Sequence, residues 1–430
     1  MMLRNFVARF TVCLLIFWLS SADVKKNVTR DDKNEHHSKS ILGTPCFVLC
    51  NCTKAKADCS RNYGKLTYVP RLPSEIRTLD FSYNDLREIQ NPNFFINVTG
   101  VTSIDLSNNE LTYLNKQIFL PIRSLRKFVL DNNPGLNYST IERAVFSLEH
   151  LGTLSLRNTS LRTLPPNAFN NHSLPRLTKL SLGSNQFYLW NLSVFAQLPV
   201  LKKLYLDKTL TVRAATDFPL SKCKYLALSY SGLYGFPETC KNGHSMFPRL
   251  LTLKLLFNYI SHLPNEICLP KLLKLHLGYN LIHTVVSGMF SGEFFPKMKT
   301  LNLISMPYIH DALNLHSHAF NNTALSSLYL MYNNIRFDTD KVHPDVFAGC
   351  TSLETLQVSH NYFTYISDEK FQRLFAPLLN LRTLYMGSCG IREITSNTFD
   401  TCPSLQMLSL YKNKLVSLPD GAFDKMMKLT

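Results

Sequence analysis

The chain of 430 residues has none of the short motifs that mark the common catalytic sites. A P-loop, a G-x-G-x-x-G turn, an H-E-x-x-H pair and a nucleophile elbow are all missing. Three histidines in residues 310–318 (HDALNLHSH) have no fixed scaffold spacing, so a metal site is not expected there. We therefore expect neither an enzyme nor a cofactor-binding protein.

Dense clusters of basic residues are also missing, although the formal net charge is +16. A positive surface permits anionic partners such as nucleic acid, acidic glycans or anionic lipids. No stacked-aromatic RNA motif and no Lys/Arg run point to nucleic acid in particular. An anionic ligand therefore stays open as one class of partner, without being required.

Long apolar runs are missing as well. Arg4 and Arg9 precede an apolar run at 12–19, which is far shorter than the roughly 20 residues needed to span a membrane. Small residues at 20–22 complete the pattern of a secretory signal, predicted at 1–22. Residues 23–43 are charged and polar and are predicted to be a disordered leader. The chain is thus expected in the secretory pathway, on the extracellular or endosomal lumenal side.

From residue 76 onward the chain repeats one pattern: Leu-x-x-Leu-x-Leu-x-x-Asn-x-Leu, with other apolar residues in some Leu positions. Clear copies begin at Val101, Leu177, Leu272, Leu325 and Leu405. About fourteen copies fill 76–428 with a period of about 25 residues, which predicts a leucine-rich-repeat solenoid. The expected fold class is α/β, a horseshoe whose L-x-L cores form a parallel β-sheet on the concave face.

Two further residue types recur at fixed positions of the repeat, asparagine and phenylalanine. The Asn of each copy can donate to and accept from the backbone of the turn that leaves the strand. Thr159, Thr209, Ser231 and Cys389 replace it with small polar side chains, whereas Met306 departs from the pattern, so the copies beginning at Leu201 and Met298 are expected to be distorted. Phenylalanines recur in the return segments and predict an aromatic spine on the convex side: Phe119, Phe146, Phe169, Phe195, Phe290, Phe320, Phe347, Phe399 and Phe423.

Four cysteines precede the first repeat: Cys46, Cys50, Cys52 and Cys59. A solenoid needs a cap over the exposed end of its core, and disulfides can stabilise a cap too small to have its own core. We therefore predict a disulfide-bonded N-terminal cap at 44–75, in preference to a zinc site, which would have paired C-x₂-C spacing. Four cysteines allow three connectivities, and the spacing alone does not choose among them.

The remaining cysteines and the sequons also follow the repeat frame. Cys240 and Cys268 occupy near-equivalent positions in adjacent copies and are candidates for a convex-side disulfide, whereas Cys350 and Cys402 are expected to be buried thiols. Eight N-x-[ST] sequons are candidate glycosylation sites: Asn27, Asn51, Asn97, Asn137, Asn158, Asn171, Asn191 and Asn321. Seven of these precede residue 200, so the stretch from about 200 to 320 is the better candidate for ligand contact.

Variable positions beside the central Leu of each strand should point out of the concave face. Small and polar residues dominate the early copies, and a basic and aromatic set appears from the fifth copy onward. Exposed aromatics near cations are typical of binding surfaces, although tyrosine also suits a strand surface for purely structural reasons. The predicted ligand-binding residues are Tyr205, Tyr225, Lys254, Phe257, Lys274, His276, Tyr279, Tyr329 and Tyr332.

Repeat number, Phe register and cysteine-rich cap together resemble the ectodomain of the Toll-like receptor family, over residues 44–430. The resemblance implies an innate-immune pattern-recognition receptor that binds a microbial ligand and dimerises with itself or another leucine-rich-repeat receptor. It also implies the cap disulfides Cys46–Cys52 and Cys50–Cys59. Residues 429–430 begin an incomplete copy, so we expect a fragment whose membrane anchor lies in a missing C-terminal segment.

The alternative is a secreted leucine-rich-repeat protein that binds extracellular protein or glycan partners. Slit-type guidance proteins and small matrix proteoglycans share both the cap spacing and the repeat. A matrix or adhesion protein, or a decoy that sequesters ligand, would need no signalling region. A downstream apolar span followed by a TIR domain would distinguish the receptor from these alternatives.

Overall fold

The computed structural model describes residues 50–62, 66, 69–70, 72–169, 173–306 and 312–430. The predicted signal and leader, Cys46 and the sequons at Asn27 and Asn171 lie outside these residues. Contacts divide the chain into Met1–Gly43 and Thr44–Thr430, and all described residues belong to the second unit.

One sheet of sixteen strands runs through the described part of this unit. Only β1 and β2 pair antiparallel; every later neighbour in the sheet is parallel and in the same register from repeat to repeat. The strands, in spatial order, are β1 (Asn51–Cys52), β2 (Lys56–Asp58), β3 (Thr78–Asp80), β5 (Ser103–Asp105), β7 (Lys127–Val129), β8 (Thr153–Ser155), β9 (Lys179–Ser181), β11 (Lys203–Tyr205), β13 (Tyr225–Ala227), β16 (Thr252–Lys254), β17 (Lys274–His276), β19 (Thr300–Asn302), β21 (Ser327–Tyr329), β22 (Thr355–Gln357), β23 (Thr383–Tyr385) and β24 (Met407–Ser409).

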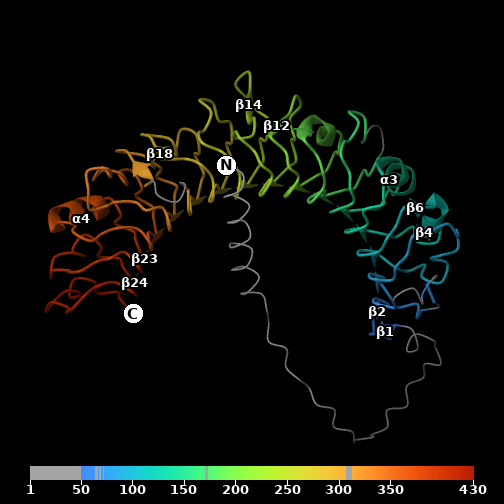
Figure 1. Ribbon diagram of the computed structural model, residues 1–430, viewed down its shortest axis with the longest axis horizontal. Helices are drawn as coiled ribbons and strands as arrows, with labels where there is room; N and C mark the ends of the chain where they lie inside the picture. Colours follow the sequence, from blue (N-terminus) through green and yellow to red (C-terminus); the bar gives the residue numbers. More distant parts are fainter. Residues whose placement is uncertain (1–49, 63–65, 67–68, 71, 170–172, 307–311) are drawn as a thin grey trace, which may run out of the picture. The chain divides into compact units, whose positions relative to one another are not determined.

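Figure 1 shows these strands along the inner edge of the arc formed by the described residues from 50 to 430. The middle residue of each three-residue strand of this sheet from β2 to β23, such as Leu79, Leu204 or Leu275, is fully buried, because side chains alternate across a strand and this one faces the core; Leu408 of β24 is partly buried. Its two neighbours face the concave side. The predicted leucine-rich-repeat solenoid is therefore confirmed.

Short and varied elements form the outer side of the arc (Figure 1). They include the 3₁₀ segments η1 (Lys116–Phe119) and η2 (Leu192–Gln197) and the helices α3 (Tyr138–Val145) and α4 (Asp368–Phe375). Four two-stranded sheets complete this side: β4 (Glu88–Ile89) with β6 (Tyr113–Leu114), β10 (Leu189–Asn191) with β12 (Arg213–Ala215), β14 (Cys240–Lys241) with β15 (His244–Ser245), and β18 (Thr284–Val285) with β20 (Asn314–Leu315). None of the helices among the described residues has the length and apolar character needed to cross a bilayer.

The asparagines of the repeat pattern, which we call the slot asparagines, form a buried ladder that joins each repeat to the one before it. Asn109 is typical: its Oδ1 accepts from the backbone N–H of Asn84 (2.9 Å) and of Leu86 (3.1 Å) in the preceding repeat. Its Nδ2 donates to the carbonyls of Leu106 (2.9 Å) and Phe81 (3.2 Å). These bonds satisfy backbone groups that the tight turn leaves buried and without a strand partner.

Phenylalanine rings contact one another in separate runs rather than one spine. A run near the cap links Phe95, Phe119 and Phe128 at 6.4 and 5.4 Å, and two more runs lie along the outer side. Phe146, Phe169 and Phe195 follow one another at 4.9 and 6.0 Å between ring centroids. The other outer run begins at Phe290 and continues through Phe320 and Phe347 at 6.2 and 6.0 Å. Between the two runs, a disulfide joins Cys240 of β14 to Cys268.

The cap contains a disulfide between Cys50 and Cys59, and Cys52 is disulfide-bonded as well. The cap strand β2 pairs in parallel with β3 of the first repeat, so the cap extends the solenoid sheet. The free cysteines among the described residues, Cys223, Cys350, Cys389 and Cys402, are all buried. Disulfides beside a predicted signal indicate the oxidising secretory pathway.

Candidate binding surface

The centre of the concave face, from β9 to β17, brings together most of the predicted ligand-binding residues. Tyr205 of β11 and Tyr225 of β13 lie with ring centroids 4.9 Å apart. The ammonium groups of Lys179 and Lys254 lie over these rings, 5.1 Å from that of Tyr205 and 5.7 Å from that of Tyr225 respectively. The two rings are only partly exposed, so lysine and tyrosine side chains hold one another in place here.

The next two strands add more positive charge. Strand pairing places Lys254 beside His276, and Thr252 of the same strand beside Lys274. No ion pair among the described residues includes Lys179, Lys203, Lys254 or Lys274. We call the residues Lys179, Lys203, Tyr205, Tyr225, Lys254, Lys274 and His276 the central patch.

Titration of His276 and Asp207 reflects this surrounding charge and burial. Burial, followed by repulsion from Lys254 and Lys274, lowers the pKa of the His276 imidazole to about 4. His276 is consequently neutral at pH 5–6 in the free protein. Burial raises the pKa of the Asp207 carboxyl, which accepts a hydrogen bond from the Ser229 backbone N–H at 2.8 Å. The positive charge of the patch therefore comes from its lysines, and Lys254 also interacts with the Asp207 carboxyl.

Three rings form what we call the aromatic ledge, just beyond the strands: Tyr230, Phe257 and Tyr279. Phe257 lies nearly parallel to both neighbours, 4.2 Å from the ring of Tyr230 and 4.0 Å from that of Tyr279. Lys208 places its ammonium 5.6 Å from the ring centroid of Tyr230. The ledge thus extends the central patch along the edge of the concave face.

Backbone conformation makes these aromatics unexpected. Tyr230, Phe257 and Tyr279 have φ values of 56°, 55° and 59°, a region that bulky side chains disfavour and asparagine tolerates. Earlier copies have Asn132 and Asn158 at the equivalent position, at φ 57° and 51°. Local preference therefore does not explain the rings, and positions that break a local rule are candidates for function.

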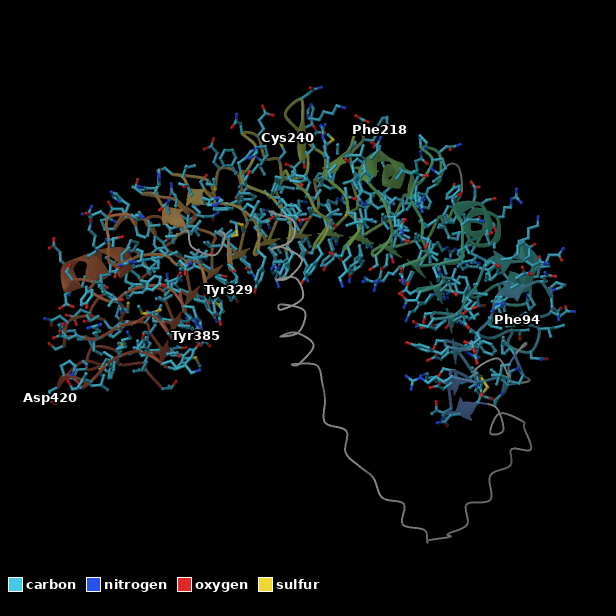
Figure 2. All side chains as sticks on the ribbon, in the orientation of Figure 1. Phe94, Phe218, Cys240, Tyr329, Tyr385 and Asp420 are labelled. Atoms are coloured by element: carbon cyan, nitrogen blue, oxygen red, sulfur yellow. A yellow bond between two sulfur atoms is a disulfide. The ribbon has the colours of Figure 1, made fainter. Side chains whose placement is uncertain are left out.

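Tyr329 and Tyr332 were predicted with this group, but the structure places them apart from it. β19 separates Tyr329 from β17, and Ser305 occupies the ledge position before Tyr332. Tyr332 stacks instead on His360 at 4.0 Å, and the Tyr411 hydroxyl lies 3.3 Å from His360 Nε2. Figure 2 shows Tyr329 and Tyr385 on the inner side of the arc, with Cys240 and Phe218 on the outer side.

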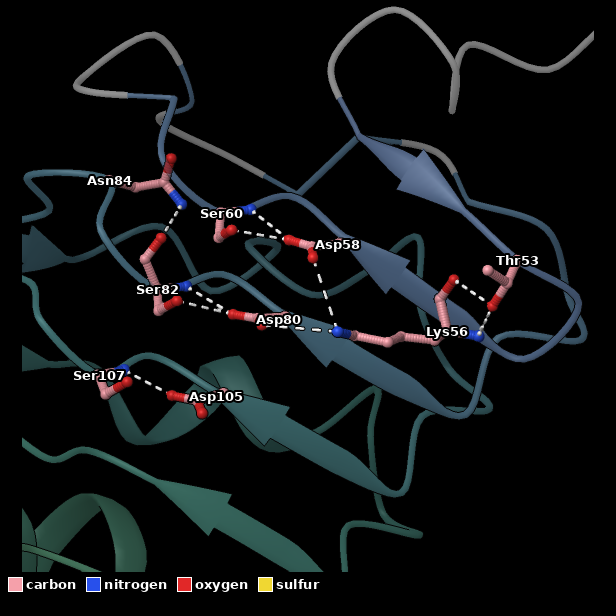
Figure 3. Close-up of polar contacts among 9 residues, drawn as sticks. All are labelled: Thr53, Lys56, Asp58, Ser60, Asp80, Ser82, Asn84, Asp105 and Ser107. Carbon is pink, nitrogen blue, oxygen red and sulfur yellow. Dashed lines mark hydrogen bonds and ion pairs between the residues drawn. The ribbon is translucent and has the colours of Figure 1, made fainter. Parts of the chain in front are cut away.

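The first strands carry the opposite charge, as Figure 3 shows. Asp58, Asp80 and Asp105 lie side by side on β2, β3 and β5, and each Oδ1 accepts from the backbone N–H of the serine two residues later, at 3.2, 3.2 and 2.8 Å. Lys56 contacts only the first two carboxylates, at 3.6 and 3.8 Å. We call Asp58, Asp80 and Asp105 the acidic strip.

Asp58 was missed in the sequence because it precedes the first complete repeat. The signal that could have found it is the Asp-x-Ser pattern, which occurs at 58–60 and again at 80–82 and 105–107. Hydrogen bonds from Ser60 lower the pKa of the Asp58 carboxyl, so this group is ionised at neutral pH.

Six of the eight sequons lie among the described residues, and all six asparagines are exposed: Asn51, Asn97, Asn137, Asn158, Asn191 and Asn321. None of them lies on a strand of the central patch. Of these six, only Asn158 occupies the position in its repeat that Tyr230, Phe257 and Tyr279 occupy in theirs, and its Nδ2 donates to Asn132 Oδ1 at 3.0 Å. The exposure is compatible with glycosylation.

Comparison with known proteins identifies the repeat class. A family model described as "Leucine rich repeat" matches residues 74–134 and 149–210. Another, described as "BspA type Leucine rich repeat region (6 copies)", matches 290–406 and 314–430. The protein is a leucine-rich-repeat solenoid protein, a class of typically non-enzymatic binding scaffolds that present extended concave surfaces.

Its relatives include both receptors and matrix proteins. The chain is 27% identical to osteomodulin of Rattus norvegicus over 53% of this chain and 52% of that protein. It is 26% identical to Toll-like receptor 9 of Felis catus, over 83% of this chain and 32% of the receptor. It is also 26% identical to podocan-like protein 1 of Homo sapiens, over 81% and 54%. The chain thus spans about half the length, or less, of these relatives.

Solved structures share the fold. A leucine-rich-repeat protein of Leptospira interrogans matches with a TM-score of 0.55 and 22% identity, over 87% of this chain and 82% of that one. The TLR13–ssRNA13 complex matches with a TM-score of 0.59 and 20% identity, over 87% and 67%. The chain is therefore an extracellular-type leucine-rich-repeat protein similar to Toll-like receptors and to small leucine-rich proteoglycans.

Proposed function

We propose that this chain is the ligand-recognition region of a Toll-like innate-immune receptor. The receptor binds a microbial ligand on the concave face and dimerises when the ligand is bound. The central patch and the aromatic ledge form the contact surface. The observation that carries the proposal is the concentration, at the middle of the sheet, of lysines that form no ion pair among the described residues and lie around packed aromatic rings. The likeness to Toll-like receptor 9 over most of this chain supports the receptor class.

The chemistry of the patch favours a ligand with negative groups at that point. Lys254 and Lys274 lie on adjacent strands and are offset by two residues, about 8 Å between Cα atoms, so their long side chains can both reach one carboxylate or phosphate on the concave face. Tyr205 and Tyr225 add flat, partly apolar area beside the charge. Aromatic side chains flanked by cations are the residues that dominate binding energy at protein interfaces.

A second candidate function is that of a secreted matrix or adhesion protein. The observation in its favour is the similarity to osteomodulin and podocan-like protein 1, which equals that to the receptor in percentage identity. Under this alternative the same concave surface binds an extracellular protein or glycan. Reporter signalling from cells that express the full-length gene would separate the two, because only a receptor activates a cytoplasmic pathway.

The binding surface itself is tested with hexaglutamate as a defined anionic probe. We expect the secreted chain to bind it at low ionic strength, and the variant K254E/K274E to lose at least tenfold in affinity. The matched control, K116E/K297E, makes the same charge change at two exposed lysines outside the sheet and should bind as the wild type does. Equal losses in both variants would show that the probe senses only net charge, against the proposed surface.

A further inference from the structure

Charge is segregated along one file of concave positions, and this separation limits what the surface can hold. Strand pairing places these residues directly side by side, one per repeat: Asp58, Asp80, Asp105, Val129, Ser155, Ser181, Tyr205, Ala227, Lys254 and His276. The file begins with three acids, is uncharged from Val129 to Ala227, and then reaches Lys254 beside the neutral His276. The other lysines of the central patch lie at the neighbouring concave position of strands β9, β11 and β17. No conformational change is needed to display both signs on the same face.

Asp80 and Lys254 lie too far apart for one small molecule to contact both, although the nearest members of the acidic strip and the central patch, Asp105 and Lys179, are three strand-to-strand steps, about 14 Å, apart. Asp80 and Lys254 are separated by seven strand-to-strand steps. At about 4.8 Å a step, this is about 33 Å along the sheet. Only a macromolecule, or an extended chain, spans that distance.

The acidic strip keeps carboxylate oxygens available toward the concave face. Each Oδ1 is occupied by the turn serine that follows it. Lys56 lies 3.6 and 3.8 Å from the Oδ2 atoms of Asp58 and Asp80. Both contacts come from one half-exposed lysine, whose ammonium is shared between two partly exposed carboxylates, and such ion pairs compete weakly with a cationic partner. Asp105 takes part in no ion pair among the residues that the structure describes.

We infer that the partner of this concave face is a protein segment of mixed charge, whose anionic part lies on the central patch and whose cationic part lies on the acidic strip. The inference rests on the proposed binding surface and adds the chemical class of the partner. A uniform polyanion such as nucleic acid would place phosphates against Asp58, Asp80 and Asp105, and like charges at that range repel. A polypeptide carries both signs at separate positions on one molecule.

The test uses synthetic peptides and the secreted full chain. The bipolar peptide has six glutamates at one end, six lysines at the other, and a Gly/Ser linker of about 36 residues, whose root-mean-square length of about 33 Å matches the span. Hexaglutamate, and a peptide that mixes the same charged residues evenly, are the comparison probes. We expect the bipolar peptide to bind at least tenfold more tightly than either, because both ends engage at once.

The decisive variant is D80N/D105N, in which each amide oxygen keeps the hydrogen bond from the turn serine and the fold is retained. It should reduce binding of the bipolar peptide to that of hexaglutamate and leave hexaglutamate binding unchanged. The matched control, E149Q/E266Q, removes two exposed acids outside the sheet and should change nothing.

Three outcomes decide the matter. A bipolar peptide that binds no more tightly than hexaglutamate overturns the mixed-charge partner but leaves the central patch intact. An oligothymidylate of about 30 nucleotides that binds more tightly than the bipolar peptide, and gains from D80N/D105N, shows a polyanion partner and also overturns the inference. If the affinity for hexaglutamate is the same in K254E/K274E as in the wild type, the proposed surface itself is refuted.

Discussion

Replacing Asn280 by alanine should destabilise the solenoid far more than the same change at an exposed asparagine. Asn280 is 2% exposed, and its Oδ1 accepts from the Ile260 backbone N–H at 3.0 Å. Its Nδ2 donates to the carbonyls of Leu277 at 2.6 Å and Leu255 at 2.8 Å. The truncation removes these three bonds and a longer one from Nδ2 to the Gly278 carbonyl at 3.4 Å.

The magnitude follows from which backbone groups keep another partner. The Leu255 carbonyl still accepts from Asn258 Nδ2 at 3.0 Å. The Leu277 carbonyl has no such substitute, because the next slot holds Met306, which has no amide. Two buried groups, Leu277 C=O and Ile260 N–H, therefore lose their partner at about 1–3 kcal/mol each, so the loss should be about 3 kcal/mol.

The assay combines guanidinium denaturation with hydrogen exchange of the Ile260 amide. Threonine is a milder substitution at this position. In the repeat that contains Thr209, the threonine hydroxyl donates to the Leu206 carbonyl of the same turn at 2.9 Å. Asn280→Thr should therefore cost about half as much as Asn280→Ala. Asn380, which is exposed and donates to the Thr351 carbonyl at 2.8 Å, is the matched control. Equal stability of Asn280→Ala and Asn380→Ala would refute the reasoning.

The remaining predictions concern the disulfide, the histidine and the buried thiols. The double variant C240A/C268A removes a disulfide between residues separated by 28 in sequence, and its free energy of unfolding should fall by about 3.5 kcal/mol in the chain-entropy picture. Amide exchange at β14 and β15 should be faster, and unchanged exchange there would count against this prediction. His276 has a folded pKa of about 4, below its unfolded value near 6.5, so the unfolded chain binds more protons between these values. The full shift corresponds to about 3 kcal/mol, which solvent screening of this half-buried group reduces to about 2 kcal/mol. Stability should therefore fall by that amount as the pH drops through this window, and H276Q should flatten that part of the curve. An anion bound at the central patch would raise the pKa of His276, so hexaglutamate should bind more tightly as the pH falls; calorimetry in two buffers would detect the proton uptake. Burial raises the pKa of the Cys350 and Cys402 thiols to about 12, so iodoacetamide at pH 8 should label neither in the native chain and both after unfolding.

The repeat frame was predictable because its cause is local and periodic. The apolar residue in the middle of each strand from β2 to β23 is buried, and the asparagine of the repeat satisfies backbone groups of the turn that follows. The expected distortion of the copies beginning at Leu201 and Met298 does not extend to their strands, since β11 and β19 keep the common parallel register. At Thr209 the side-chain hydroxyl makes the hydrogen bond to the turn that an asparagine amide makes in other repeats. Met306 still donates its backbone N–H to Asn333 Oδ1 at 2.6 Å.

The binding surface was less predictable because it depends on which repeats are neighbours at each position. The sequence grouped Tyr329 and Tyr332 with the central aromatics, and one intervening strand separates them. The low pKa of His276 arises from lysines on its own strand and the next one, which the sequence places two and 22 residues away. Asp58 joins the concave face only because the cap strand continues the sheet.

A glycan placed in the middle of the concave face tests the central claim most directly. Ile304→Thr completes an N-x-T sequon at Asn302 of β19, which pairs with His276 of the central patch. The control, Gln117→Thr, completes a sequon at Asn115 beside η1 on the outer side. With occupancy verified by mass spectrometry, the glycan at Asn302 should abolish hexaglutamate binding and the glycan at Asn115 should not. Full binding by the chain glycosylated at Asn302 would contradict a concave, central ligand site.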